Sequence, residues 1–158
     1  MGPGQGIGPP DEAQALGART LRVILDTNVL LSALIRVDSK PYKLVRAWLD
    51  GRFELVSSEA QLEELRRVSR YEQLRVYFAP AEVGWLVNRI RERAFLVKRL
   101  PKVDVADDPG DNYLLAMAAA GEAQYLVTGD KSDLIALGRR RGTHLVTVQE
   151  MVSTLKLR

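Results

Sequence analysis

Two short apolar runs in this chain end beside an aspartate, and this pattern limits the folds that the chain can adopt. The run 21–25 is followed by Asp26, and the run 125–128 is followed by Gly129 and Asp130. Runs of this length, rich in Leu and Val, are typical of buried strands. In open parallel α/β sheets the carboxyl ends of the strands face the ligand crevice. A carboxylate is costly to desolvate there unless a cation meets it, so both aspartates are candidate functional residues.

Helical patterns separate these apolar runs along the chain. Further strands are predicted at 53–56, 96–100 and 144–148. Helices are predicted at 29–35, 41–50, 58–68, 70–78, 80–95, 113–121, 133–141 and 149–155. Strands that alternate with helices favour an α/β fold of three layers, α/β/α, with a central, mainly parallel sheet.

Residues 1–19 differ from the rest of the chain because they are rich in Gly and Pro and poor in large apolar side chains. Such a segment buries little surface, so it is predicted to be a disordered N-terminal extension. Residues 20–158 are expected to form one domain, and no apolar run is long enough to cross a membrane. The chain has no cysteine, which excludes thiolate metal sites and is compatible with a cytoplasmic location.

A third acidic candidate lies on the helix that begins near residue 58. Ser58 and Gln61 match the capping-box pattern at its start. At about 100° per residue, Glu64 falls at the border of the buried face near Val68, whereas Glu63 points away from the core. Glu64 is therefore better aimed at an interior cleft, although a solvated helix residue is the alternative reading of this glutamate alone.

The segment 107–112, with the sequence DDPGDN, forms a second acidic cluster. Pro109 and Gly110 argue against a regular element there. Asp111 falls at or just before the first turn of the next predicted helix, where a carboxylate meets free backbone N–H groups. Taken alone, Asp111 is equally well a helix cap and Asp108 equally well a turn former.

Considered together, the acidic positions predict a site for a divalent metal ion. Like charges gathered in a crevice repel one another, so a fold that gathers them needs a compensating cation. Hard oxygen ligands select Mg²⁺ or Mn²⁺ over zinc, and such ions suit phosphoryl chemistry. The candidate metal ligands are Asp26, Glu64, Asp108, Asp111 and Asp130.

The order of these motifs resembles that of the PIN domain family. The matching stretches are 25–30, 58–65, 107–112 and 126–131, and the resemblance covers about residues 21–155. The combination of DTN, the DDPxDN cluster and VTGD is more specific than any of these motifs alone. Within the family, the chain looks most like the bacterial VapC-type toxins, the toxin components of toxin–antitoxin pairs.

The resemblance implies an endoribonuclease dependent on Mg²⁺ or Mn²⁺, in which water attacks a phosphodiester in line and leaves a 5′-phosphate and a 3′-hydroxyl. The catalytic, metal-binding carboxylates that it implies are Asp26, Glu64, Asp111 and Asp130. Asp108 is an auxiliary that stays a candidate ligand. Asn28 and Thr128 match the polar positions that orient the carboxylates.

RNA is thus the expected partner, and the weak basic bias of the chain, a net charge of +3, is compatible with a polyanion. The arginines expected to contact the RNA backbone are Arg66, Arg67, Arg70 and Arg75. The alternative for this set is a solvated helix face. The resemblance also implies a cognate antitoxin that occludes the crevice, and homodimers are common in the family.

Two other classes of function fit part of the pattern. A phosphatase of the haloacid-dehalogenase type also places an aspartate after its first strand, but its chemistry needs a second aspartate where this chain has Asn28. A non-catalytic module that binds RNA or a protein partner is the other alternative. The intact acidic positions weaken it, because bare carboxylates repel nucleic acid in the absence of metal.

Overall fold

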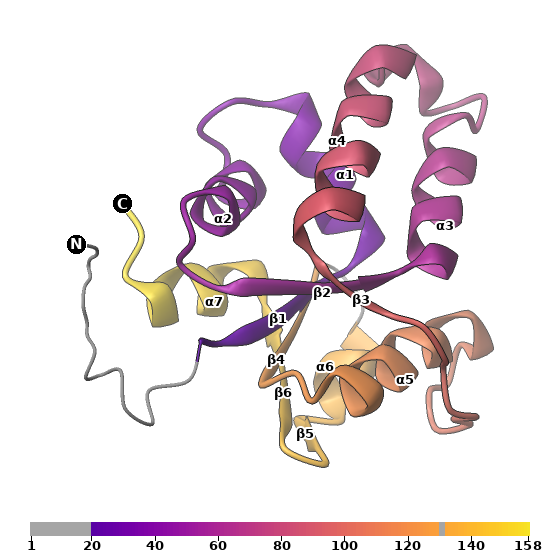
Figure 1. Cartoon of the computed structure of the whole chain (residues 1–158), viewed down its shortest axis with the longest axis vertical. Coiled ribbons are helices and arrows are strands. Elements are labelled where there is room, and N and C mark those ends of the chain that lie inside the picture. Colours follow the sequence, from indigo (N-terminus) through magenta and orange to yellow (C-terminus); the bar gives the residue numbers. More distant parts are fainter. Residues whose placement is uncertain (1–19, 130–131) are drawn as a thin grey trace.

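The computed structural model describes residues 20–129 and 132–158. In this part of the chain, six strands form one sheet in the order β3-β2-β1-β4-β6-β5, with helices on both faces (Figure 1). The strands are β1 (Arg22–Leu25), β2 (Glu54–Ser58), β3 (Phe95–Val97), β4 (Tyr125–Thr128), β5 (Arg139–Arg140) and β6 (Thr143–Thr147). The predicted N-terminal extension, residues 1–19, lies outside the described residues and stays a prediction.

The pairing of the strands confirms the predicted mainly parallel sheet. Strand β1 pairs in parallel with β2 and β4, β2 with β3, and β4 with β6, whereas the short β5 is antiparallel to β6. The connections include two short 3-10 turns, η1 (Arg75–Tyr77) and η2 (Pro109–Asp111). The helices are α1 (Thr27–Ile35), α2 (Lys40–Leu49), α3 (Glu59–Ser69), α4 (Pro80–Arg93), α5 (Asn112–Gly121), α6 (Ser132–Ala136) and α7 (Val148–Leu155).

Strand β1 is apolar on both sides and joins the three layers. Val23 and Leu25 belong to the core beneath α1, α2, α3, α4 and α7, whereas Ile24 belongs to the core beneath α5 and α6. All three side chains are fully buried, and burial of such a side chain contributes about 1.5–3 kcal/mol. A central parallel strand covered on both faces needs a continuous apolar run rather than an alternating one.

The order of the strands reverses between β1 and β4. The chain passes from β1 to β2 and β3 on one side of the sheet, and β4 then lies on the other side of β1. In open α/β sheets a ligand crevice forms at the carboxyl ends of the two strands that flank such a switch point. The N–H of Asp26 donates to the carbonyl of Val127 at 2.9 Å, so the pairing of β1 with β4 extends to the predicted acidic position.

The predicted helix at 70–78 is wrong. The segment forms turns and the short η1, and it connects α3 to α4, which stand side by side (Figure 1). Residues 70–77 are largely exposed, so a helix there would have no buried face to stabilise it. Pro80 adds a local reason: it drives the preceding Ala79 into extended backbone, and a new helix begins at the proline.

The predicted helix at 133–141 is also wrong in its second half, because α6 ends at Ala136. Arg139 and Arg140 form β5, which folds back on β6. The residues of the turn, Arg141 and Gly142, both have positive φ values of 49° and 86°, as two-residue hairpin turns require. The third predicted strand is displaced as well: β3 spans Phe95–Val97 rather than 96–100.

None of the helices in the described part of the chain is long and apolar enough to cross a membrane.

Helix α5 approaches the sheet closely at Gly121. A Cβ atom built on this glycine would lie 2.7 Å from Cγ1 of Val56 on β2. Gly84, inside α4, is the opposite case, because nothing lies within 4 Å of its built Cβ. The two helical glycines therefore form a matched pair that tests the packing.

Gly121→Ala should lower the free energy of unfolding by about 1–3 kcal/mol, because a β-branched valine in a strand cannot move aside cheaply. Gly84→Ala should raise it by about 0.5–1 kcal/mol, because alanine restricts the unfolded chain and favours the helix. Urea denaturation of both variants measures these changes. Equal stability of Gly121→Ala and the unmodified protein would contradict the packing of α5 on β2.

Candidate active site

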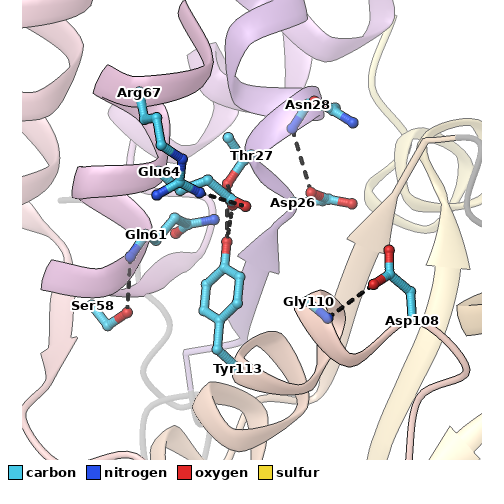
Figure 2. Close-up of polar contacts among 10 residues, drawn as sticks. All are labelled: Asp26, Thr27, Asn28, Ser58, Gln61, Glu64, Arg67, Asp108, Gly110 and Tyr113. Atoms are coloured by element: carbon cyan, nitrogen blue, oxygen red, sulfur yellow. Dashed lines mark hydrogen bonds and ion pairs between the residues drawn. The ribbon is translucent and has the colours of Figure 1, made fainter.

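Asp26 lies at the carboxyl end of β1, where it is also the N-cap residue of α1. It is buried, with 2% of its surface exposed. Its carboxylate accepts hydrogen bonds from the backbone N–H of Asn28 at 3.4 Å and from Thr128 Oγ1 at 3.1 Å (Figure 2 shows the Asn28 contact). Because Thr128 ends β4, these contacts hold the carboxylate between the two central strands. Asn28 contacts Asp26 through its backbone N–H, and Asn28 itself is an exposed residue.

Gln61 fixes helix α3 to the end of β1. Its buried side chain donates from Nε2 to the carbonyl of Leu25 at 2.8 Å and accepts at Oε1 from Ser57 Oγ at 2.6 Å. Ser58 Oγ caps α3 by accepting from the Gln61 N–H at 3.3 Å. The predicted capping box is thus only half formed, because the Gln61 side chain binds β1 and β2 instead of returning to Ser58. This anchor sets the rotation of α3 and directs Glu64, one turn further on.

Two hydroxyl groups from different helices meet at one oxygen of Glu64 (Figure 2). Oε1 of Glu64 accepts from Thr27 Oγ1 at 2.5 Å and from the Tyr113 hydroxyl. The two hydroxyl oxygens lie 3.1 Å apart. The other carboxylate oxygen, Oε2, lies 3.9 Å from the guanidinium of Arg67. Helices α1, α3 and α5 are therefore linked at this carboxylate, and Thr27, the residue of α1 that binds it, directly follows Asp26 in the chain.

Thr27 and Tyr113 were not predicted from the sequence. Thr27 is part of the DTN motif, and Tyr113 directly follows the acidic cluster, so their positions next to candidate ligands are the only local signal. Neither position reveals the contact with Glu64, which lies 37 residues from Thr27 and 49 from Tyr113 in the chain.

The acidic cluster places its two aspartates differently. Asp111 is buried, at 6% exposed, and occupies the N-cap position of α5. Its side chain makes no capping hydrogen bond to that helix, so the alternative reading of Asp111 as a cap lacks its defining contact. Asp108 is exposed and accepts from the N–H of Gly110 at 2.9 Å (Figure 2). This is the contact of a turn former.

Comparison with known families gives an independent finding. A family model for the PIN domain matches residues 22–132. The chain belongs to the PIN domain family. PIN domains are typically nucleases and generally use divalent metal ions. The match does not distinguish the VapC-type branch, and the comparison with curated proteins returned no match.

The donors of this PIN domain fit a hard cation by their chemistry. Asp26, Glu64 and Asp111 are carboxylates, the ligand type that Mg²⁺ and Mn²⁺ prefer. Within residues 20–129 and 132–158, however, no group of three or more acidic, histidine or cysteine side chains is gathered closely enough to hold a metal ion. The further predicted ligand, Asp130, lies outside the described residues. The ligand set therefore stays a prediction.

The structure divides the predicted RNA-binding arginines of the PIN domain into two groups. Arg67 lies beside Glu64, as described above. Arg66, Arg70 and Arg75 instead line one cavity between α3, η1 and α4. The four arginines therefore do not form one uniform helix face.

Burial raises the pKa of Tyr113 well above its usual range, and its hydrogen bond to Glu64 adds to the effect. The negative charges of Glu64 and Asp26 act in the same direction, since a phenolate would be repelled by both carboxylates. Tyr113 is thus a permanent donor at ordinary pH. It can hold the Glu64 carboxylate but cannot serve as a base.

The pKa of Tyr113 can be tested with Tyr113→Phe. In the unfolded chain Tyr113 ionises near its ordinary pKa of about 10, whereas in the folded protein it stays protonated. The stability that this hydroxyl contributes is therefore present below about pH 10 and is lost as the pH rises further. The free energy of unfolding, measured by urea denaturation from about pH 8 to 11, should fall more steeply for the unmodified protein than for Tyr113→Phe. Parallel curves would show that the hydroxyl is not held as described.

Proposed function

We propose that this PIN domain is an endoribonuclease that uses Mg²⁺ or Mn²⁺ to hydrolyse RNA phosphodiester bonds. The observation that supports it best is that Asp26 at the switch point of the sheet and Glu64 on α3, from distant parts of the chain, both act on the Tyr113 hydroxyl through their charges. Thr27, which directly follows Asp26, donates to Glu64. Asp111, also buried, begins the helix that carries Tyr113. Buried carboxylates at a ligand crevice favour a cationic cofactor and a reaction at a phosphate.

The residues proposed to hold the ion are Asp26, Glu64, Asp111 and Asp130, with Asp108 as the further candidate. A bound divalent ion supplies positive charge to the phosphate and lowers the pKa of a water molecule. The chain offers no cysteine and a single histidine, His144, which is exposed on β6 at the far side of β4. Oxygen donors are therefore the only ones proposed.

The other polar residues of the site keep these carboxylates in place. Thr128 and the N–H of Asn28 hold the carboxylate of Asp26 between β1 and β4. Thr27 and Tyr113 occupy Oε1 of Glu64, which leaves Oε2 as the oxygen better placed for a ligand. Carboxylates that are fixed before the substrate arrives need little rearrangement during the reaction. The proposed hydrolysis leaves a 5′-phosphate and a 3′-hydroxyl.

A toxin role is the narrower part of the proposal, and its support is the order of the motifs described above. A cognate antitoxin that covers the crevice and a homodimer are proposed from the same resemblance. A cytoplasmic location is proposed with them, because a chain without cysteine is compatible with it. Growth arrest on expression of the unmodified chain, absent for Asp26→Asn, would support the toxin role. Normal growth in both cases would leave a nuclease without that role.

Substitution of single carboxylates tests the nuclease. Asp26→Asn, Glu64→Gln and Asp111→Asn should each lower the rate of RNA cleavage more than about 100-fold, because each removes a proposed ligand charge. Glu63→Gln and Asp107→Asn are the matched controls, because both residues are exposed neighbours of the proposed ligands, and both variants should cleave normally. Cleavage of a labelled RNA with mapped ends gives the rates, and circular dichroism checks that each variant is folded.

Full cleavage activity in Asp26→Asn or Asp111→Asn would contradict the proposal. RNA binding that is equal in EDTA and in Mg²⁺, without cleavage products, would instead favour a non-catalytic binding module. Asp108→Asn is informative for the ligand set, because an asparagine oxygen can also accept from the Gly110 N–H and keep the turn. Loss of activity in this variant would place Asp108 among the ligands, and retained activity would leave it as a turn former.

Metal binding can be measured without any reaction. A ligand at 100 times its dissociation constant stabilises the folded state by about 2.7 kcal/mol, so Mn²⁺ should raise the melting temperature of the unmodified protein. Asp26→Asn and Asp111→Asn should lose most of this increase, whereas Glu63→Gln should keep it. An equal increase in all four proteins would mean that the ion binds elsewhere.

A further inference from the structure

The hydroxyl of Tyr113 completes the hydrogen bonding of one oxygen of Glu64. An ionised carboxylate has two oxygens, and each can accept about two hydrogen bonds. Oε1 of Glu64 accepts one from Thr27 Oγ1 at 2.5 Å and one from the Tyr113 hydroxyl, and the two donors converge on this oxygen in Figure 2. Groups of the chain therefore fill both acceptor positions of Oε1.

The second oxygen of Glu64 is held only weakly. Within the described part of the chain, the charged group nearest to Oε2 is the guanidinium of Arg67 at 3.9 Å, which is beyond the reach of a hydrogen bond. The side chain of Arg67 is 61% exposed, and an ion pair of this kind is weak and easily displaced. Glu64 can thus offer Oε2 to an ion, but it can offer both oxygens only if a hydroxyl gives way.

The position of Tyr113 makes such a change costly. The residue lies at the start of α5, where it is half-buried, and a tyrosine ring has few rotatable bonds with which to follow a moving partner. Thr27 holds the same oxygen from α1. Rotation of the Glu64 carboxylate would break two hydrogen bonds to a charged acceptor, which belong to the strong class.

The carboxylate of Asp26 is restricted in a similar way. Its Oδ1 accepts from the N–H of Asn28 at 3.4 Å, and its Oδ2 accepts from Thr128 Oγ1 at 3.1 Å. Each oxygen of Asp26 therefore already has a hydrogen bond from the chain. The fold thus limits the number of oxygens that these two proposed ligands can present to one ion.

The number of oxygens that a carboxylate presents distinguishes two common divalent ions. Ca²⁺ takes about 6–8 oxygen ligands in a flexible geometry and readily binds both oxygens of one carboxylate. Mg²⁺ is smaller, requires near-ideal octahedral geometry and keeps several water molecules, so one oxygen from each of a few carboxylates is enough for it. A glutamate with one oxygen already occupied by hydroxyl groups therefore suits Mg²⁺ and is a poor ligand for Ca²⁺.

We propose that Tyr113 is a positioning residue that makes Glu64 a one-oxygen ligand, so that the site prefers Mg²⁺ to Ca²⁺. Tyr113 acts through Glu64 and is not itself a ligand. This inference rests on the proposed function, which provides the ion, and adds to it a residue that determines which ion is bound. Tyr113 is also the donor that can be removed most cleanly, because phenylalanine keeps the ring and lacks only the hydroxyl.

The test measures ion affinities in the absence of RNA. Binding of Mn²⁺ is followed by the electron paramagnetic resonance signal of the free ion, and Mg²⁺ and Ca²⁺ are then titrated as competitors. Loss of a partner that holds a metal ligand typically lowers metal affinity by about 10–100-fold. Tyr113→Phe should therefore lower the affinity for Mg²⁺ about tenfold, whereas the affinity for Ca²⁺ should stay equal or rise, because Oε1 becomes available to it.

Two further variants show whether the change in preference acts through Glu64. Tyr125→Phe is the matched control, because Tyr125 begins β4 at the end of the strand opposite Thr128, and it should leave the ratio of the two affinities unchanged. In the double variant Tyr113→Phe, Glu64→Gln the ratio should return to that of Glu64→Gln alone, since an amide has only one oxygen to offer. Circular dichroism checks that each variant is folded.

The outcomes distinguish this inference from the proposed function. An unchanged ratio of Ca²⁺ to Mg²⁺ affinity in Tyr113→Phe, even with weaker binding of both ions, would leave Tyr113 a purely structural role and overturn the inference, although the protein may still cleave RNA. A raised ratio in a protein that never cleaves RNA would uphold the inference and reject the nuclease. Mn²⁺ binding that is absent from the unmodified protein, or that survives fully in Asp26→Asn, would overturn both.

Discussion

The burial of Asp26 between the two central strands is the constraint on which the rest of the structure depends. Its N–H extends the pairing of β1 with β4, and its carboxylate accepts from Thr128 at the end of β4. A charge removed from water at this point is costly unless hydrogen bonds and a cation offset the loss. The fold supplies hydrogen bonds from the start of α1 and the end of β4, and the switch point is the place where open α/β sheets bind their ligands.

The helices around this point are organised by a second carboxylate, Glu64. Thr27 at the start of α1 and Tyr113 in α5 both donate to its Oε1, so one oxygen of α3 joins helices on opposite faces of the sheet. Hydrogen bonds to a charged acceptor contribute about 1.5–3 kcal/mol each. The site is therefore also a structural junction, and its geometry is set before any ligand binds.

The sequence alone predicted those features that depend on local composition. Buried strands need continuous apolar runs, and parallel strands bring their carboxyl ends to one edge, so Asp26 could be placed at the crevice without coordinates. The two wrong helix predictions, at 70–78 and 133–141, have one cause. Both segments have the residue spacing of a helix, but the packing or pairing partner that decides their conformation is distant in the chain or missing. Strand β5 exists only because β6 pairs with it, and the contact of Tyr113 with Glu64 is likewise tertiary.

Helix α3 shows how much can follow from the rotation of a single element. Gln61 fixes that rotation by its hydrogen bonds to Leu25 and Ser57. With the helix so held, Glu64 faces the hydroxyls of the site, and Arg66 lines the cavity between α3, η1 and α4. Since successive residues of a helix diverge by about 100°, a small error in that rotation would displace the carboxylate and the guanidinium together. The buried Gln61 amide thus sets the direction of a proposed catalytic carboxylate, which gives this polar side chain a role in the core.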